Sequence, residues 1–182
     1  MPTCRVHQDG FTLIELLVTV AILGVLLAIA APSFRSLLAS NRAHAISMEL
    51  SAALMHARSE AVRRATRVTI CKSSNTDNAS PTCTTASGTS WASGWLVFTD
   101  GGTIGTVDGS DARLKVGQPS IENGSIASSE ANFANYIAFD SRGGLLSLGG
   151  TTSTTLNICV TPSQRSIQIA PVGRIHTSSG SC

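Results

Sequence analysis

The sequence contains none of the short motifs that place catalytic residues at a recognisable spacing. It has no C-x-x-C, H-E-x-x-H, P-loop, G-x-G-x-x-G or G-x-S-x-G pattern. Its four histidines are spread along the chain, and only His176 falls in the strand-rich carboxyl-terminal part. We therefore expect a protein that is not an enzyme and that holds no metal and no cofactor.

Charged residues are also scarce, at 13% of the chain, and the formal net charge of +2 is too small to make the whole molecule a binder of polyanions. Acidic side chains are missing altogether after Asp140. The chain beyond that residue still carries Arg142, Arg165, Arg174 and His176. Its carboxyl-terminal end is therefore locally cationic.

A long apolar run occupies residues 11–31, and its only charged residue is Glu15. At about 1.5 Å per residue, a helix over this run covers roughly the 30 Å hydrocarbon core of a bilayer. An ordinary signal peptide has a shorter apolar stretch, and a plain anchor does not account for a carboxylate that costs about 2.5–3.5 kcal/mol at the centre of a span. Cleavage between Gly10 and Phe11 would create an amino group close to Glu15. The same group on a neighbouring copy could neutralise the carboxylate, which predicts a packing register between subunits.

Beyond Pro32, apolar residues recur at spacings of three and four, which predicts that the helix continues as an amphipathic segment over 32–65. These residues are Ile46, Leu50, Ala53, Leu54, Ala57 and Ala61. From Thr66 the period changes to two, and seven short segments follow that are predicted as strands, near 68–70, 94–100, 112–118, 136–139, 155–160, 165–170 and 173–177. One long helix followed by such strands predicts an α+β protein with a mainly antiparallel sheet.

Five cysteines are present, and Cys4 would be lost with any segment removed before Phe11. The remaining four are an even number, which suits an oxidising compartment and permits three pairings. The pairing we favour joins Cys71 to Cys83 and Cys159 to Cys182, because each bond closes a local loop or fixes a terminus. The first would stabilise the Ser- and Thr-rich loop 73–90 by about 3 kcal/mol.

Residues 10–15, Gly-Phe-Thr-Leu-Ile-Glu, resemble the junction between leader and mature chain in type IV prepilins and pseudopilins, with Pro32 where such helices commonly kink. Three further segments are similar to signatures of the GspH/FimT branch of minor pilins and pseudopilins. They are Gly94-Trp95-x-Val97-Phe98-x-Asp100, Phe139-Asp140-x-Arg142-Gly143 and Gly173-Arg174-Ile175. The resemblance covers nearly the whole chain from Gly10 to His176 and leaves loop 73–90 unassigned.

This resemblance implies a pilin-like fold and a division into a cleaved leader (1–10), a transmembrane and assembly helix (11–31), its amphipathic continuation (32–65) and a periplasmic β-rich domain (66–182). It further implies cleavage after Gly10 by a prepilin peptidase, N-methylation of Phe11 and assembly with other pilin or pseudopilin subunits. Glu15 and Pro32 would act in assembly. The chain would cross the inner membrane once, in contact with its lipid, before entering a filament or its tip.

Two other functions remain open. In the FimT subset, a carboxyl-terminal G-R-x-R element is associated with DNA capture for natural transformation, and this chain has Gly173, Arg174, Ile175 and His176. Arg165, Arg174 and His176 would then contact double-stranded DNA, although a histidine at the second basic position is mostly neutral at pH 7. Alternatively, Arg174 orders the last strand or pairs with Asp140. The remaining function is that of a type II secretion pseudopilin that contacts export substrates.

Overall fold

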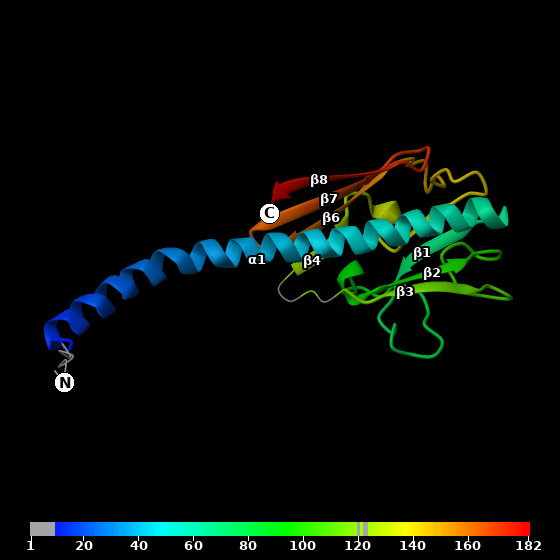
Figure 1. Ribbon diagram of the computed structural model, residues 1–182. Helices are drawn as coiled ribbons and strands as arrows, with labels where there is room; N and C mark the ends of the chain where they lie inside the picture. Colours follow the sequence, from blue (N-terminus) through cyan, green and yellow to red (C-terminus); the bar gives the residue numbers. More distant parts are fainter. Residues whose placement is uncertain (1–9, 120, 122–123) are drawn as a thin grey trace, which may run out of the picture. The chain divides into compact units, whose positions relative to one another are not determined.

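The computed structural model describes residues 10–119, 121 and 124–182. The chain divides into two compact units, Met1–Leu37 and Leu38–Cys182. One helix, α1 (Leu13–Arg64), contributes to both, and the expected leader residues 1–9 lie outside the described part of the chain (Figure 1).

The first unit holds the apolar part of α1, whose side chains are exposed on every side. Phe11 is 84% exposed, Leu13 77% and Ile29 70%. By length and composition α1 is apolar enough to cross a membrane, and none of its most apolar window is buried. Because exposed apolar area of this size is unfavourable in water, the segment requires lipid or protein around it.

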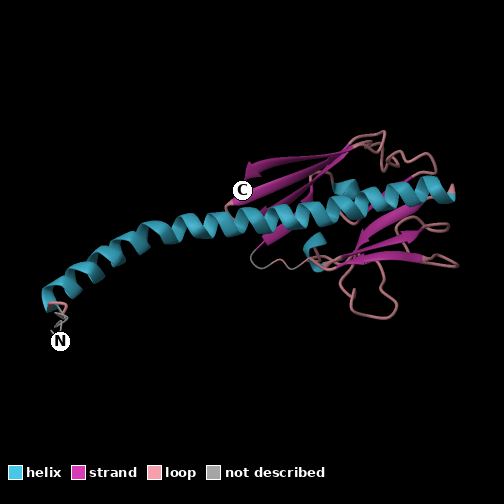
Figure 2. Cartoon of the chain, in the orientation of Figure 1, coloured by secondary structure: helices cyan, strands magenta, loops and turns pink. Residues whose placement is uncertain are grey.

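The second unit contains two four-stranded antiparallel sheets (Figure 2). The first has the order β3-β2-β1-β5, with β3 (Arg113–Gly117), β2 (Trp95–Thr99), β1 (Val68–Lys72) and β5 (Tyr136–Phe139). The second has the order β4-β6-β7-β8, with β4 (Gly124–Ser128), β6 (Thr154–Val160), β7 (Ser163–Ile169) and β8 (Ile175–Ser181). Two short 3-10 helices, η1 (Trp91–Ser93) and η2 (Ala131–Phe133), lie in the connections.

The core of this unit forms where the amphipathic face of α1 meets both sheets. Helix residues Ala43, Leu50, Leu54, Ala57 and Ala61 are fully buried in one cluster with residues of β1, β2, β5, β6 and β7. A smaller cluster of Cys71, Leu96 and Phe98 is buried separately, with Cys83 and Tyr136 packed against it. The helix stripe predicted from the sequence is therefore the buried one.

The α+β class, the continued helix and the antiparallel pairing agree with the sequence-based expectation, but the strand count does not. The chain forms eight strands in two sheets, whereas the sequence predicted seven strand segments in one sheet. The missed strand is β4, which buries only Ile126 and is otherwise small and polar. A five-residue strand with one buried side chain gives no alternating apolar pattern, so periodicity could not detect it.

Candidate functional site

The start of α1 is fixed by Thr12. Its side-chain oxygen accepts a hydrogen bond from the backbone N–H of Glu15 at 3.3 Å, and its carbonyl accepts from Leu16 N–H at 3.2 Å. A Thr followed three residues later by Glu is a capping box, in which the threonine satisfies one of the free N–H groups of the first turn. The sequence-based reading of Glu15 missed this local role, which the T-x-x-E spacing could have revealed.

Glu15 is exposed, and among the described residues it forms no ion pair. A carboxylate in the first turn interacts favourably with the positive end of the helix dipole. A carboxylate at position 15 therefore stabilises the start of the helix. Because the side chain is exposed, it is also accessible to a binding partner. Gly10 and Phe11 immediately precede this cap and are also exposed, and position 32 lies within α1.

Arg58 connects α1 to two turns far away in the sequence. Its Nε donates to the carbonyl oxygen of Gly143 at 2.9 Å, and its terminal guanidinium nitrogen donates to the carbonyl oxygen of Val172 at 3.0 Å. The first carbonyl belongs to the turn after β5, and the second belongs to the turn between β7 and β8. Two of the three signature segments named from the sequence therefore meet at one helix side chain, which those signatures do not include.

Both turns need glycine where they meet. Gly143 has φ +80° and Gly173 has φ +73°, a region that other residues rarely adopt. A Cβ on Gly173 would also overlap the carbonyl oxygen of Gly143 and press on Arg58. Asp140 shapes the first turn, since its Oδ1 accepts from the N–H groups of Arg142 and Gly144, each at 2.9 Å.

The third signature segment ends in Asp100, a buried carboxylate with three donors. They are the Arg67 guanidinium at 2.7 Å, the Thr69 hydroxyl at 2.6 Å and the Gly105 N–H at 2.8 Å. Together these donors tie the end of β2 to the start of β1 and to loop 101–111. Buried carboxylates are tolerated when they are paired and hydrogen-bonded in this way, so Asp100 has a structural role.

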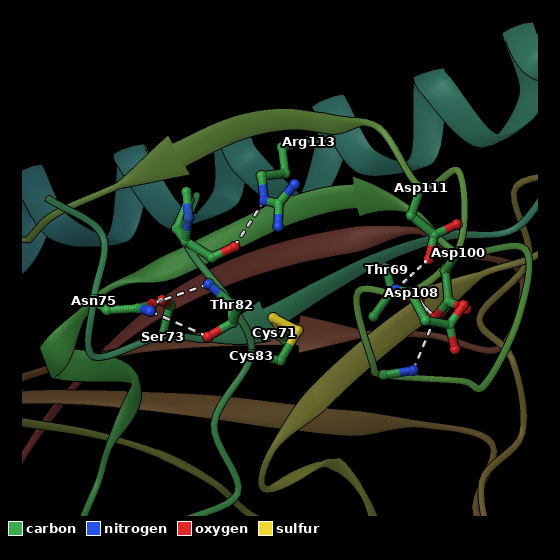
Figure 3. The surroundings of a disulfide bond; sticks show 12 residues. Thr69, Cys71, Ser73, Asn75, Thr82, Cys83, Asp100, Asp108, Asp111 and Arg113 are labelled. Atoms are coloured by element: carbon green, nitrogen blue, oxygen red, sulfur yellow. Dashed lines mark hydrogen bonds between the residues drawn. A yellow bond between two sulfur atoms is a disulfide. The ribbon is translucent and has the colours of Figure 1, made fainter. Parts of the chain in front are cut away.

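Loop 73–90 is held by the Cys71–Cys83 disulfide and by polar contacts (Figure 3). The Asn75 side-chain oxygen accepts from Ser73 Oγ at 2.9 Å and from Thr82 N–H at 3.0 Å. Arg113 Nε donates to the carbonyl of Pro81 at 2.8 Å. The Ser- and Thr-rich composition therefore forms an ordered loop over the outer face of the first sheet.

The second disulfide joins Cys159 of β6 to Cys182, directly after β8. The Cys182 N–H also donates to the Pro162 carbonyl at 3.1 Å. The end of the chain is thereby fastened to the β6–β7 turn. Both disulfides are the pairs favoured from the sequence.

The structure does not gather the three basic residues named as a DNA site. Arg165 lies opposite Ser179 in the β7–β8 register, and His176 lies opposite Gln168. Side chains alternate between the faces of a strand, so Arg165 shares the face of the buried Ile167 and Ile169, whereas His176 projects from the other face. Arg165 is half-buried. A joint surface that contains Arg165 is therefore not supported by this geometry.

Arg174 pairs through its backbone with Ala170, whose N–H donates to the Arg174 carbonyl at 2.9 Å. This continues the register, so Arg174 falls on the same outer face as His176, and both side chains are exposed. Asp140, the alternative partner of Arg174, instead has its ion pair with Arg142 at 3.7 Å. Arg142 is 90% exposed and stands next to the Gly143–Gly173 contact, as Arg174 does. Arg142, which the sequence-based site left out, directly precedes Gly143 in the chain, and Arg174 directly follows Gly173.

The last turns of α1 carry the one clearly shifted acid among the described groups that titrate. Glu60 accepts from Arg63 at 2.9 and 2.5 Å and from Arg64 at 2.6 Å. These hydrogen bonds, the one from Arg63 first, lower the pKa of Glu60 to about 2. The cluster offsets the unfavourable position of a carboxylate near a helix carboxyl terminus.

A long amino-terminal helix packed on antiparallel sheets is the pilin-like α+β fold. Comparison with known families agrees: residues 46–173 match the family described as Type II transport protein GspH, and residues 5–31 match the prokaryotic N-terminal methylation motif. The family match spans more than half of the chain. This protein therefore belongs to the GspH family of minor pilins and pseudopilins.

Two solved structures of the type IV minor pilin FimU from Pseudomonas aeruginosa share this fold. One has a TM-score of 0.57 at 22% identity, over 76% of this chain and 89% of that one. The other has a TM-score of 0.54 at 21% identity, over 74% and 91%. No curated protein sequence matches the chain significantly. At these identities the likeness establishes the fold alone.

Proposed function

We propose that this protein is a non-enzymatic minor subunit of a type IV pilus or type II secretion filament, cleaved after Gly10, N-methylated at Phe11 and assembled through its apolar helix. One observation carries the proposal. In a chain of the GspH family, the Gly10–Phe11 junction lies directly before a capped helix start whose apolar side chains are all exposed.

Each residue at this junction has a chemical role. Gly10 and Phe11 lie before the helix begins at Leu13, so the scissile bond is outside the helix and exposed to a peptidase. Cleavage would free the Phe11 amine one residue before the Thr12 cap. Glu15, which has no ion-pair partner among the residues described, would then accept the amine of an adjacent subunit and set the stagger between the two.

The membrane and the filament are successive surroundings of the same segment. Residues 11–31 would span the inner membrane once, in contact with lipid, with 32–65 as the amphipathic continuation and 66–182 as a periplasmic domain. After assembly the apolar segment would be covered by other pilin or pseudopilin subunits. Two disulfides suit the oxidising periplasm.

Processing and assembly can be tested separately. In cells with active prepilin peptidase, Gly10→Leu should leave the full-length chain in the membrane, because a bulky residue replaces the glycine before the cut. Glu15→Ala should be cleaved normally but should enter filaments poorly. Normal filament entry by both variants would contradict the proposal.

A type IV pilus subunit and a type II secretion pseudopilin should bind different partner proteins. A pilus subunit should co-purify with sheared surface pili, whereas a secretion pseudopilin should cross-link to secretion components and to export substrates. Mass spectrometry of partners cross-linked in cells decides between them.

DNA capture is kept as a second candidate because Arg174 and His176 share one exposed face and Arg142 stands beside the adjacent turn. A surface with so few phosphate contacts should bind double-stranded DNA weakly, without sequence preference and with steep loss as salt rises. A mobility-shift titration of the full chain in detergent tests this candidate. Arg174→Ala should weaken binding and Arg165→Ala should not. Unchanged DNA mobility at low salt would reject the receptor role.

A further inference from the structure

Strand β8 lies at the edge of the second sheet (Figure 1). It pairs with β7 over its whole length, Ile175–Ser181, without a shift in the register. The strand contains no proline and no Asp, Glu, Lys or Arg, and every residue after Ile175 is exposed. A long, regular and uncharged edge can pair with a strand of another chain, so natural proteins usually protect such edges.

Three other strands in the described part of the chain lie at sheet edges, and each is protected. β3 carries Arg113 and Lys115, and its register with β2 is broken by a shift. β5 has four residues, and the Leu146 N–H already donates to the Ala138 carbonyl at 2.8 Å. β4 has five residues and lies against η1. β8 is therefore the edge that is open to an added strand.

The hydrogen bonds at the two ends of the β7–β8 pair show which backbone groups of β8 are free. The Ala170 N–H donates to the Arg174 carbonyl at 2.9 Å, and the Cys182 N–H donates to the Pro162 carbonyl at 3.1 Å. In an antiparallel pair, residues bonded to the partner strand alternate with residues whose N–H and C=O point away from it. The residues of β8 that point away from β7 are therefore Ile175, Thr177, Ser179 and Ser181. Each offers one N–H and one C=O to an incoming strand.

Arg165 of β7 lies one strand inward from this edge. It is opposite Ser179 in the register, so the two side chains share the face that is turned towards the core. Arg165 is half-buried, and within the described part of the chain it forms no hydrogen bond and no ion pair. Ser179 is small and exposed, so it leaves the guanidinium accessible from the edge.

This arrangement selects the charge of the incoming strand. Neighbouring strands are about 4.8 Å apart, so an added strand would lie about 10 Å from β7. An arginine and a glutamate side chain together span that distance over the small Ser179. A carboxylate opposite Ser179 would therefore pair with Arg165, and the bond would be charge-assisted.

A second copy of this chain does not supply the matching charge. None of its four described edge strands contains Asp or Glu, and β3 would bring further cations. Pairing of β8 with any of them would leave Arg165 without a carboxylate. An extended acidic segment of a different protein provides both main-chain hydrogen bonds to the edge and the ion pair.

We infer that the free edge of β8 binds an extended strand of another protein, whose Asp or Glu lies opposite Ser179 and pairs with Arg165. Every group that this contact uses belongs to the second unit, Leu38–Cys182, so the inference does not depend on the proposed function. The contact gives the second unit a binding surface of its own, separate from the apolar helix.

Two synthetic peptides with blocked ends test this on the full chain in detergent. The probe is Thr-Val-Thr-Glu-Thr-Val-Thr, and in the control peptide glutamine replaces the glutamate. In NMR spectra the probe should shift the backbone amides of Thr177 and Ser179 and slow their hydrogen exchange, because these N–H groups point towards the added strand. The probe should bind about fivefold more tightly than the control, the gain expected of a partly exposed ion pair. Unchanged amides with both peptides, or equal affinities, would overturn the inference.

Three variants separate the edge from its charge. Arg165→Gln should abolish the fivefold preference, whereas Arg174→Gln should keep it, because Arg174 is an exposed cation on the opposite face. Ser179→Pro removes an N–H that points away from β7, so the fold should persist while both peptides no longer bind. The fluorescence of the buried Trp91 and Trp95 checks the fold. A preference that survives Arg165→Gln, or binding that survives Ser179→Pro, contradicts the inference.

Photo-cross-linking in cells tests whether a natural partner uses this edge. The full chain with p-benzoylphenylalanine at Ser178 should cross-link to a segment of a different protein that contains Asp or Glu. Ser178 is exposed, and its own backbone bonds to β7, so the probe stands beside the incoming strand. Adding Ser179→Pro should remove the adduct. An adduct on β8 of a second copy, an adduct that persists with Ser179→Pro, or no adduct at all overturns the inference.

Discussion

Arg58 Nε donates a hydrogen bond to the carbonyl oxygen of Gly143 at 2.9 Å, across 85 residues of sequence. The same guanidinium reaches the Val172 carbonyl, so one helix residue holds the turn after β5 against the turn before β8. Gly143 and Gly173 therefore have a structural role in these signature segments. Without a Cβ at Gly173, the two turns can approach each other closely next to Arg58.

Replacing Arg58 with alanine should destabilise the second unit by about 2–3 kcal/mol, because two carbonyls lose a charged donor. Urea unfolding of the full chain in detergent, followed by the fluorescence of the buried Trp91 and Trp95, measures the change. Arg64→Ala is the control and should cost less than about 1 kcal/mol, since the Arg64 side chain forms an ion pair with Glu60 four residues earlier on the same helix. If the two substitutions lowered the free energy of unfolding equally, the Arg58 hydrogen bonds would not contribute more to stability than a surface ion pair.

Gly173→Ala should cost more than Gly88→Ala. Both glycines have positive φ, at +73° and +86°, so both substitutions incur backbone strain of about 1 kcal/mol. Only at Gly173 does the new Cβ overlap a backbone atom, the carbonyl oxygen of Gly143, whereas nothing lies within 4 Å of a Cβ at Gly88. The difference between the destabilisation by Gly173→Ala and that by Gly88→Ala measures the cost of the overlap between the new Cβ and the Gly143 carbonyl. A difference near zero would mean that the two turns move apart at little cost in free energy.

Asp100→Asn should destabilise the second unit by about 2–4 kcal/mol. The change removes the charge that pairs with Arg67, whose side chain is 27% exposed and so keeps part of its hydration. Asp77→Asn, at an exposed loop position, is the matched control and should stay within about 0.5 kcal/mol of wild type. The same fluorescence-monitored unfolding measures both, and a near-neutral Asp100→Asn would refute the structural role of this carboxylate.

The Glu60 cluster predicts a pH dependence of defined sign. Because hydrogen bonds from Arg63 and Arg64 lower the pKa of Glu60 from 4.5 to about 2, the ionised form is favoured in the folded state. The stabilisation is fully present above about pH 4.5 and is lost as the pH falls towards about 2. Carboxyl chemical shifts followed by NMR should show the low titration midpoint. In the double variant Arg63→Ala, Arg64→Ala that midpoint should return towards 4.5, and an unchanged midpoint would contradict the assignment.

Elements with strong periodicity could be predicted from the sequence, and β5 was predicted with the bounds the structure gives. Strand β4 could not, because Ile126 alone marks it, and the division into two sheets depends on pairing between distant strands. The register explains why Arg165 does not share a face with His176, because a sequence lists basic residues but does not say which face of β7 each one occupies. The role of Arg58 could not be predicted from the sequence either. Its hydrogen-bond partners are backbone carbonyl groups, which every residue has, so no residue type marks them. The motif at residues 10–15 could be recognised from the sequence because its residues are consecutive in the chain.

The account depends most on what happens between Gly10 and Phe11. Intact-mass measurement of the protein purified from the membranes of cells with active prepilin peptidase tests this most directly. The predicted mass is that of the chain from Phe11 onwards, with two disulfides and one added methyl group on the Phe11 amine. A full-length mass in those cells, or a cut at any other bond, would contradict it.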